Sequence, residues 1–150
     1  TTPQIQFDQS LPKAYLFDID GNLAQKGDRD IFDESKLHLD TEIVSVGETL
    51  RALHKAGYKV VFMSGRQDSC RKPTQKWLID NNLWMEDSEM IMRVAKDQRC
   101  DSIVKEELLR EQIAPKYNVI GVFDDRMRVN RTWYKLGVFC FNTNQDLVQF

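Results

Sequence analysis

The sequence has no long apolar run, no internal repeat and no linker rich in glycine or proline. A helix that crosses a bilayer needs about 20 mostly apolar residues in a row, so we expect no membrane segment. The first ten residues, TTPQIQFDQS, lack the basic start and the apolar stretch of a secretory signal peptide. With 150 residues and no internal boundary, the chain is expected to form a single domain over residues 1–150.

Cysteine and net positive charge are scarce as well. Cys70, Cys100 and Cys140 are spaced like neither a zinc site nor a disulfide framework. Such usage favours a reducing compartment, so we expect a cytoplasmic protein. The formal net charge of −2 argues against bulk electrostatic attraction to nucleic acid, although a local basic site remains compatible with it.

Short apolar runs of strand type alternate with helical patterns along the chain. Strands are expected at residues 14–19, 58–63, 89–94, 119–123 and 138–141. Helices are expected at residues 42–56, from Pro73 to about 81–82, at 101–114 and at 129–136. Because such alternation implies βαβ units, we predict an α/β fold with a doubly wound parallel sheet and helices on both faces. The three tryptophans are expected in or near the core.

The residues that follow these strands are unusually polar. In a doubly wound sheet, ligands bind outside the carboxyl ends of the strands. The positions at that edge include Asp18, Asp20, Gly21, Ser64, Gly65, Arg66, Lys96, Arg99, Asp101, Lys105, Asp124, Asp125 and Arg126. Acidic and basic groups together at one edge indicate a metal ion that bridges to a phosphate.

Each motif also has an ordinary explanation. Asp18 and Asp20 leave the chain on the same side at the end of a strand, yet Asp-Ile-Asp-Gly-Asn is also a common turn composition. An EF-hand loop is excluded because Leu23 and Arg29 stand where it needs glycine and glutamate.

The pair Asp124–Asp125 after VIGVF points more firmly to a cation, since two adjacent acids in an apolar setting repel each other. A helix cap would explain one of the two acids but not both.

Two further motifs are weak when each is read alone. Ser64-Gly65-Arg66 is expected at a strand-to-helix turn, where hydroxyl, backbone N–H and guanidinium groups form an anion site. The alternative is an ordinary Ser-Gly turn. Asp101 is expected to cap a helix, and Lys105 lies one helical turn further on. Alone, that pair is most simply an exposed ion pair without function.

The order of these motifs resembles the haloacid-dehalogenase-type phosphotransferases. Their D-x-D-G-T motif corresponds to residues 18–22, with Asn22 in place of threonine. A strand-terminal Ser or Thr, a Lys and an acidic pair correspond to Ser64, Lys105 and Asp124–Asp125. Within that group, the chain resembles the 3′-phosphatase domain of phage-type polynucleotide kinase/phosphatases from about residue 13 to 137. FDIDGNLA, SGR, DSIVKEEL, IAP and FDDR carry this resemblance.

The resemblance implies a Mg²⁺-dependent phosphomonoesterase that forms an aspartyl-phosphate. Asp18 is the expected nucleophile, and Asp20 the acid and base that serves the leaving oxygen and then water. Mg²⁺ is expected at Asp18, the main chain of Asp20, Asp124 and Asp125. Ser64 and Lys105 are expected to hold the phosphoryl oxygens, with substrate contacts from Arg29, Arg66, Asp101 and Arg126. Asp101 is also expected to orient Lys105 or a nearby arginine.

The expected substrate is a 3′-phosphorylated end of DNA or RNA. The motifs are too close together for a separate cap domain, and an uncovered site suits a polymer end. The acidic flap at residues 25–40 is expected to be a solvated, mobile loop apart from Arg29. Several basic residues are candidates to track a nucleic-acid backbone, although each alone is an ordinary surface charge: Arg71, Lys72, Lys76, Arg93, Lys96, Arg99, Arg128 and Arg131.

Three alternatives stay open at this point. A phosphatase of the same family could act on nucleotides or sugar phosphates, a phospho-acceptor signalling domain has a similar polar edge, and a purely structural domain leaves the acid clusters unexplained. The kinase motif G-x-x-x-x-G-K-S/T is absent. A 5′-kinase partner is therefore expected to be either fused outside this chain or separate.

Overall fold

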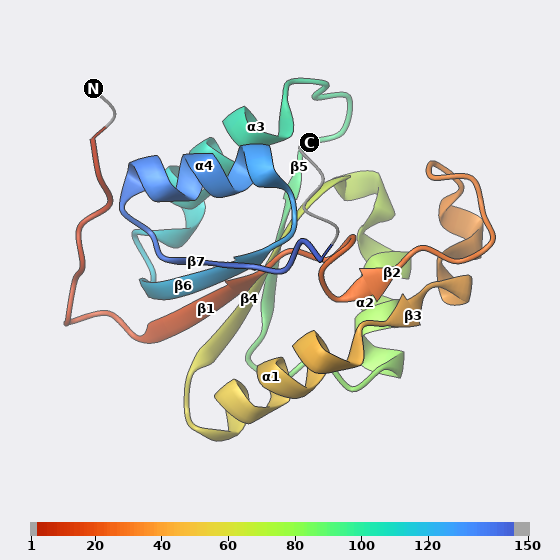
Figure 1. Cartoon of the computed structure of the whole chain (residues 1–150), viewed down its shortest axis with the longest axis horizontal. Helices are drawn as coiled ribbons and strands as arrows, with labels where there is room; N and C mark the ends of the chain where they lie inside the picture. The colour runs from red at the N-terminus through yellow and green to blue at the C-terminus, as the bar shows by residue number, and fades with distance from the viewer. Residues whose placement is uncertain (1–2, 146–150) are drawn as a thin grey trace.

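The computed structural model describes residues 3–145, which form a five-stranded sheet between two layers of helices (Figure 1). The sheet order is β5-β4-β1-β6-β7, and the strand pairs are parallel. Its strands are β1 (Lys13–Phe17), β4 (Lys59–Gln67), β5 (Glu89–Arg93), β6 (Asn118–Asp124) and β7 (Cys140–Asn142). The chain moves from β1 to β4 and β5 on one side and then to β6 on the other. The prediction of a doubly wound sheet is confirmed, and its switch point lies between β1 and β6.

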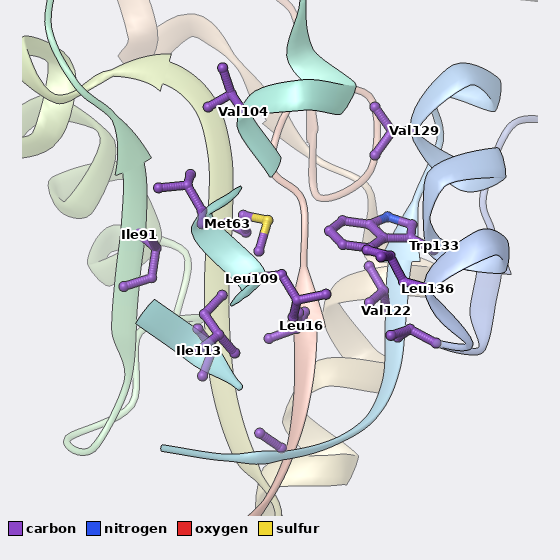
Figure 2. Close-up of a cluster of buried hydrophobic side chains, with 14 residues drawn as sticks. Leu16, Met63, Ile91, Val104, Leu109, Ile113, Val122, Val129, Trp133 and Leu136 are labelled. Carbon is purple, nitrogen blue, oxygen red and sulfur yellow. The ribbon is translucent and has the colours of Figure 1, made fainter. Parts of the chain in front are cut away.

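Two helices cover each face of the sheet. α1 (Val44–Lys55) and α2 (Arg71–Asp80) lie below it in Figure 1, and α3 (Asp101–Leu108) and α4 (Met127–Leu136) lie above. Side chains alternate along each strand. Leu16 and Met63 therefore join the core between the sheet and helices α3 and α4 (Figure 2), whereas Phe17 and Phe62 join the core between the sheet and helices α1 and α2. Burial on both faces explains why these strands read as continuous apolar runs.

Several of the expected element boundaries are wrong. Strand β4 continues through Ser64, Gly65 and Arg66 to Gln67, with an irregular register against β5 after Ser64. These residues therefore lie in an extended strand end and not in a strand-to-helix turn. The expected helix at 101–114 is split into α3 and the π-helical turn η3 (Leu109–Ile113). Helix α2 begins at Arg71, two residues before Pro73.

The segment between β1 and α1 is more ordered than its composition suggests. The strands β2 (Ala24–Gln25) and β3 (Thr41–Glu42) pair antiparallel, and the 3₁₀ helix η1 (Glu34–Leu39) lies between them. The flap, residues 25–40, stands at the right of Figure 1, beside the carboxyl ends of the central strands. A short 3₁₀ turn, η2 (Asp68–Cys70), precedes α2. None of the helices described for residues 3–145 is long and apolar enough to cross a membrane.

Candidate active site

The centre of the site lies where β1 and β6 end side by side. Phe17 pairs with Phe123, and the N–H of Asp18 donates to the carbonyl of Phe123 over 3.0 Å. This register brings the carboxylate of Asp18 next to the Asp124–Asp125 pair at the switch point of the sheet. The three side chains are buried, and they lie at the carboxyl edge of the sheet, as the sequence predicts.

Lys105 reaches this centre from the second turn of α3. Its Nζ donates to Asp18 Oδ1 over 2.9 Å and to Asp124 Oδ2 over 3.0 Å. The residue is only 1% exposed, so the alternative of an exposed, idle ion pair is wrong. Burial alone would lower the pKa of Lys105, but Asp124, Asp18 and Asp101 more than offset this effect and raise the pKa. Lys105 is therefore a permanently charged group at neutral pH.

The carboxylates outnumber the cation that they surround. One oxygen from each of Asp18, Asp124 and Asp125 lies within 4.8 Å of the other two. Burial raises the pKa of Asp18 despite Lys105, and the neighbouring carboxylates add to the rise. The pKa of Asp125 is also raised, chiefly by burial. Three carboxylates against one ammonium leave a formal excess of two negative charges, which a buried divalent cation would balance.

The turn after β1 holds Asp18 and Asp125 in register. Gly21 has φ +76°, and a Cβ there would lie 2.1 Å from Asp125 Oδ2, so only glycine allows this approach. Asn22 Nδ2 donates to the carbonyl of Asp18 over 2.7 Å, and Thr143 Oγ1 donates to Asn22 Oδ1 over 2.7 Å. Asparagine thus makes side-chain hydrogen bonds in this turn at the position where the family usually has threonine.

Asp20 is exposed and points to Arg66 instead of to the buried carboxylates. Arg66 donates from Nε and Nη2 to the two oxygens of Asp20 over 2.8 and 2.5 Å, and from Nη1 to Thr74 over 2.9 Å. The backbone N–H of Arg66 donates to the hydroxyl of Ser64, which is buried. The expected acid–base residue and an expected phosphate ligand therefore bind each other in this state.

Asp101 connects the centre to a group of arginines. Its side chain makes no capping hydrogen bond, and Cys100 occupies the N-cap of α3, so the expected cap is wrong. Asp101 instead lies 3.7 Å from Lys105, 3.3 Å from Arg93 and 3.7 Å from Arg126. This placement agrees with the expectation that Asp101 orients Lys105 or a nearby arginine. A Cβ on Gly65 would lie 2.2 Å from Asp101 Oδ1, which explains the glycine of the SGR motif.

Arg29 belongs to the flap and is buried there. Its Nε and Nη2 form a two-pronged ion pair with Asp40 at 2.7 Å each, and its Nη1 donates to two flap carbonyls. Asp40 is buried too, so the expectation of a solvated loop is wrong for Asp40, although most other residues of the flap are exposed as expected. Asp40 also lies 3.6 Å from Arg66, which joins the flap to Asp20.

Three residues support the site in ways that their sequence patterns did not predict. Trp133, which is fully buried as expected, donates from Nε1 to Asp124 Oδ2 over 3.4 Å. Thr143 binds Asn22 and also donates its N–H to the carbonyl of Asp124. Arg93 donates to the carbonyl of Gly65 and to Asp101. Among these three residues, only Thr143 could have been assigned to this edge from the sequence, because it directly follows a strand. Trp133 lies on α4 and reaches Asp124 only because the helix packs against the sheet.

Asp124 combines both roles that its sequence position allows. Its Oδ1 accepts the N–H of Arg126 at the start of α4, as a residue at a helix start does. Its Oδ2 accepts Lys105. A helix-start role therefore does not compete with a role in the carboxylate cluster.

Known proteins are similar to this chain in sequence and in fold. Residues 12–146 match the family described as the polynucleotide kinase PNKP phosphatase domain. A protein of Autographa californica nuclear polyhedrosis virus, named as a bifunctional polynucleotide kinase/RNA ligase, is 34% identical over 145 residues; the match covers 93% of this chain and 20% of the viral protein. A chain in the solved Pnkp1/Rnl/Hen1 RNA repair complex is 34% identical with a TM-score of 0.84, and the match covers 95% of this chain and 46% of that chain.

More distant likeness concerns the fold. The class C acid phosphatase from Bacillus anthracis has a TM-score of 0.63 at 12% identity, over 90% of this chain and 68% of its own. The fold is thus the haloacid-dehalogenase-like α/β fold. The chain spans about a fifth of the viral relative and just under half of the chain in the repair complex. Since the family match extends over nearly the whole sequence, this chain belongs to the polynucleotide kinase PNKP phosphatase-domain family.

Proposed function

We propose that this chain is a Mg²⁺-dependent 3′-phosphatase that removes terminal phosphomonoesters from DNA or RNA through an aspartyl-phosphate. The observation that carries the proposal is the buried cluster of Asp18, Asp124 and Asp125 around Lys105 at the switch point of the sheet. Membership of a polynucleotide kinase phosphatase family supports the choice of substrate class.

The donor set suits Mg²⁺. Carboxylate oxygens are the ligands that this ion prefers, and it usually takes few of them from the protein. Asp18, Asp124, Asp125 and the main chain of Asp20 are the residues that would hold it. When bound, the ion supplies positive charge that offsets the repulsion between a carboxylate and a phosphate dianion. The two excess negative charges of the cluster would attract this ion even before the substrate binds.

Asp18 is suited to act as the nucleophile because Lys105 fixes one of its oxygens and leaves the other for attack. That oxygen forms a bond to phosphorus as the bond from phosphorus to the 3′-oxygen breaks, and Asp20 gives its proton to the departing oxygen. Asp20 then takes a proton from water as the water attacks phosphorus. The Asp18–phosphorus bond breaks, and free phosphate leaves with Asp18 restored.

The remaining residues are proposed to bind the negatively charged oxygens of the phosphoryl group. Ser64 and Lys105 hold phosphoryl oxygens, and Arg66 contributes a fork that an arriving phosphate shares with Asp20. Asp101 keeps Lys105 and Arg126 in place for the same task. Arg29 is the substrate contact that needs the largest change, since its fork is now occupied by Asp40.

The proposed setting is nucleic-acid end repair. The viral relative is named as a kinase/RNA ligase and the structural relative comes from an RNA repair complex; a 5′-kinase on the same polypeptide or on a separate one would supply the complementary end chemistry. A reducing cytoplasm suits the three free thiols of the described structure.

The deciding experiment compares matched oligonucleotides that carry a single 3′- or 5′-phosphate, as DNA and as RNA, with and without Mg²⁺. We expect phosphate release from 3′ ends alone, and only with the metal present. A nucleoside 3′-monophosphate tests the alternative of a small-molecule phosphatase, which would turn it over at least as well as the oligonucleotide. A stable phosphorylated protein without turnover would support the phospho-acceptor alternative and contradict the proposal.

A further inference from the structure

A cavity next to the carboxylate cluster is lined mostly by arginines. Its volume is about 480 Å³, and its walls are formed by Arg93, Arg99, Cys100, Asp101, Arg126 and Arg128. The lining contains four guanidinium groups and a single carboxylate, in a chain whose net charge is −2. A cavity of this kind fits a phosphate or another small anionic group.

Most of the charges in the wall have internal partners, and one does not. Asp101 is shared between Lys105, Arg93 and Arg126. Arg99 is held by Asp97 and Glu107. Among the residues that the structure describes, Arg128 forms no ion pair, and its Nη1 makes only a long contact of 3.5 Å to the sulfur of Cys100. The cavity thus contains a guanidinium whose charge no carboxylate of residues 3–145 offsets.

Two helices also begin at this cavity. Cys100 is the N-cap of α3 and Arg126 is the N-cap of α4, and neither residue makes a capping hydrogen bond with its own side chain. The N–H of Arg126 is bound by Asp124, which leaves the N–H groups of the first turn of α4 for an anion. The first N–H groups of a helix carry a partial positive charge and favour anions. The arginines and the helix N-termini therefore both favour binding of an anion in this cavity.

The cavity lies next to the proposed reaction centre and shares Asp101 with it. Asp101 lines it and lies 3.7 Å from Lys105, which in turn binds Asp18. Arg126 also lines it and directly follows Asp125 in the sequence. A strand whose terminal phosphate lies at Asp18 therefore has a positive hollow within reach of its next phosphate group.

We propose that this arginine-lined cavity binds the internucleotide phosphodiester next to the terminal 3′-phosphate, with Arg128 as a principal ligand. This inference rests on the proposed 3′-phosphatase function and adds to it a reason for preferring polymers. A nucleoside monophosphate has no such phosphodiester and gains nothing from the cavity. Phosphate contacts of this kind position a strand without reading its sequence.

The test uses a trinucleotide with a 3′-phosphate in two forms, one natural and one with a neutral methylphosphonate at the last linkage. Hydrogen bonds between a guanidinium and a phosphate are among the stronger ones in proteins, so we expect the methylphosphonate to lower kcat/KM of the wild type about tenfold. Arg128→Ala should lose a similar factor on the natural trinucleotide and show no further loss with the methylphosphonate. Such non-additivity identifies a direct interaction between the two groups.

The matched control is Lys135→Ala, which removes an exposed positive charge from the last turn of the same helix. This variant should behave as wild type with both trinucleotides. If the wild type hydrolyses the two forms equally well, or if Arg128→Ala loses the same factor on both, the cavity does not bind the phosphodiester. Melting curves of Arg128→Ala exclude a folding defect, which an exposed residue should not cause.

A binding measurement separates this proposal from the proposed function. A fluorescent trinucleotide with a 3′-hydroxyl keeps the internal phosphates but has no bond to hydrolyse. We expect Arg128→Ala and the methylphosphonate each to weaken its binding about tenfold, and together by no more than either alone. A chain that binds in this way without releasing phosphate would overturn the phosphatase assignment only; release of phosphate without this coupling would overturn the cavity assignment only.

Discussion

The carboxylate cluster and the flap each place a buried carboxylate beside a buried cation, but their charges are balanced differently. In the cluster, three carboxylates surround Lys105, and the pKa values of Asp18 and Asp125 are raised, chiefly by burial. In the flap, one carboxylate faces one guanidinium. Burial alone would raise the pKa of Asp40, but hydrogen bonds from Arg29 and from the N–H of Gly27 lower it.

This difference distinguishes the proposed cation site from a pair of charges that is complete by itself. The flap pair has two short hydrogen bonds and no excess charge, so it stabilises a loop conformation. The cluster keeps an excess of negative charge in a low-dielectric setting, and this excess lowers the stability of the fold until a cation compensates it. Carboxylates with shifted pKa values are typical of functional sites. Changes in the cluster should therefore affect chemistry most, and changes in the flap should affect positioning.

The largest effect is expected for Asp18→Asn. The variant keeps the size of the side chain but removes the nucleophile, so turnover should fall by more than about a thousandfold. Removing one of three mutually repelling carboxylates should leave the melting temperature intact or raise it. Phosphate release and thermal melting on the same sample measure both. Activity above a thousandth of wild type would rule out the covalent route.

Lys105→Met tests the charge balance of the cluster directly. The substitution keeps the apolar stem but leaves Asp18 and Asp124 without their shared ammonium, so we expect the free energy of unfolding to fall by about 3 kcal/mol without metal. Addition of Mg²⁺ should recover part of this loss, because an ion that binds only the folded state stabilises it. Denaturant unfolding with and without Mg²⁺ measures the effect. Equal stability of variant and wild type would mean that the cluster does not depend on Lys105.

Arg29→Ala asks whether the flap contributes to the reaction or only to its own structure. We expect a loss of at least about tenfold in rate, equivalent to about 1.4 kcal/mol of transition-state stabilisation. Arg29→Lys keeps the charge without the fork and should also be impaired. The matched variant is Asp40→Asn, which disturbs the same pair but keeps the guanidinium. Equal losses in Arg29→Ala and Asp40→Asn would show that Arg29 acts through the flap and does not touch the substrate.

The smallest effect is expected in the pH dependence of the flap pair. An aspartate with a lowered pKa stabilises the fold above its unfolded pKa of about 3.9, and this contribution is lost as the pH falls through the lower, folded value. Asp40 should follow this course. The difference in melting temperature between wild type and Asp40→Asn should therefore be widest near neutral pH and shrink below about pH 4. A difference that does not change between pH 7 and pH 3 would contradict an ionised Asp40.

The sheet and its polar edge were predictable because they depend on local patterns. Apolar runs of strand type, separated by helical patterns, specify a parallel sheet, and the chemistry of such sheets lies at the carboxyl ends of their strands. Asp18, Ser64, Asp124 and Asp125 are at that edge as predicted. The continuation of β4 through Gly65 and Arg66 was not predictable, because glycine and serine after an apolar run are typical of a turn.

The sequence by itself determined the doubly wound fold and the order of the polar residues along its edge, since both follow from side-chain periodicity and strand-end position. Only the tertiary structure decided the partners. Lys105 meets Asp18 across 87 positions of chain, Asp20 meets Arg66 across 46, and Arg29 meets Asp40 within a flap whose composition suggests a solvated loop. Charge alone does not select a partner: the residues that pair are the ones that packing buries together, because a buried charge without a counter-charge is costly.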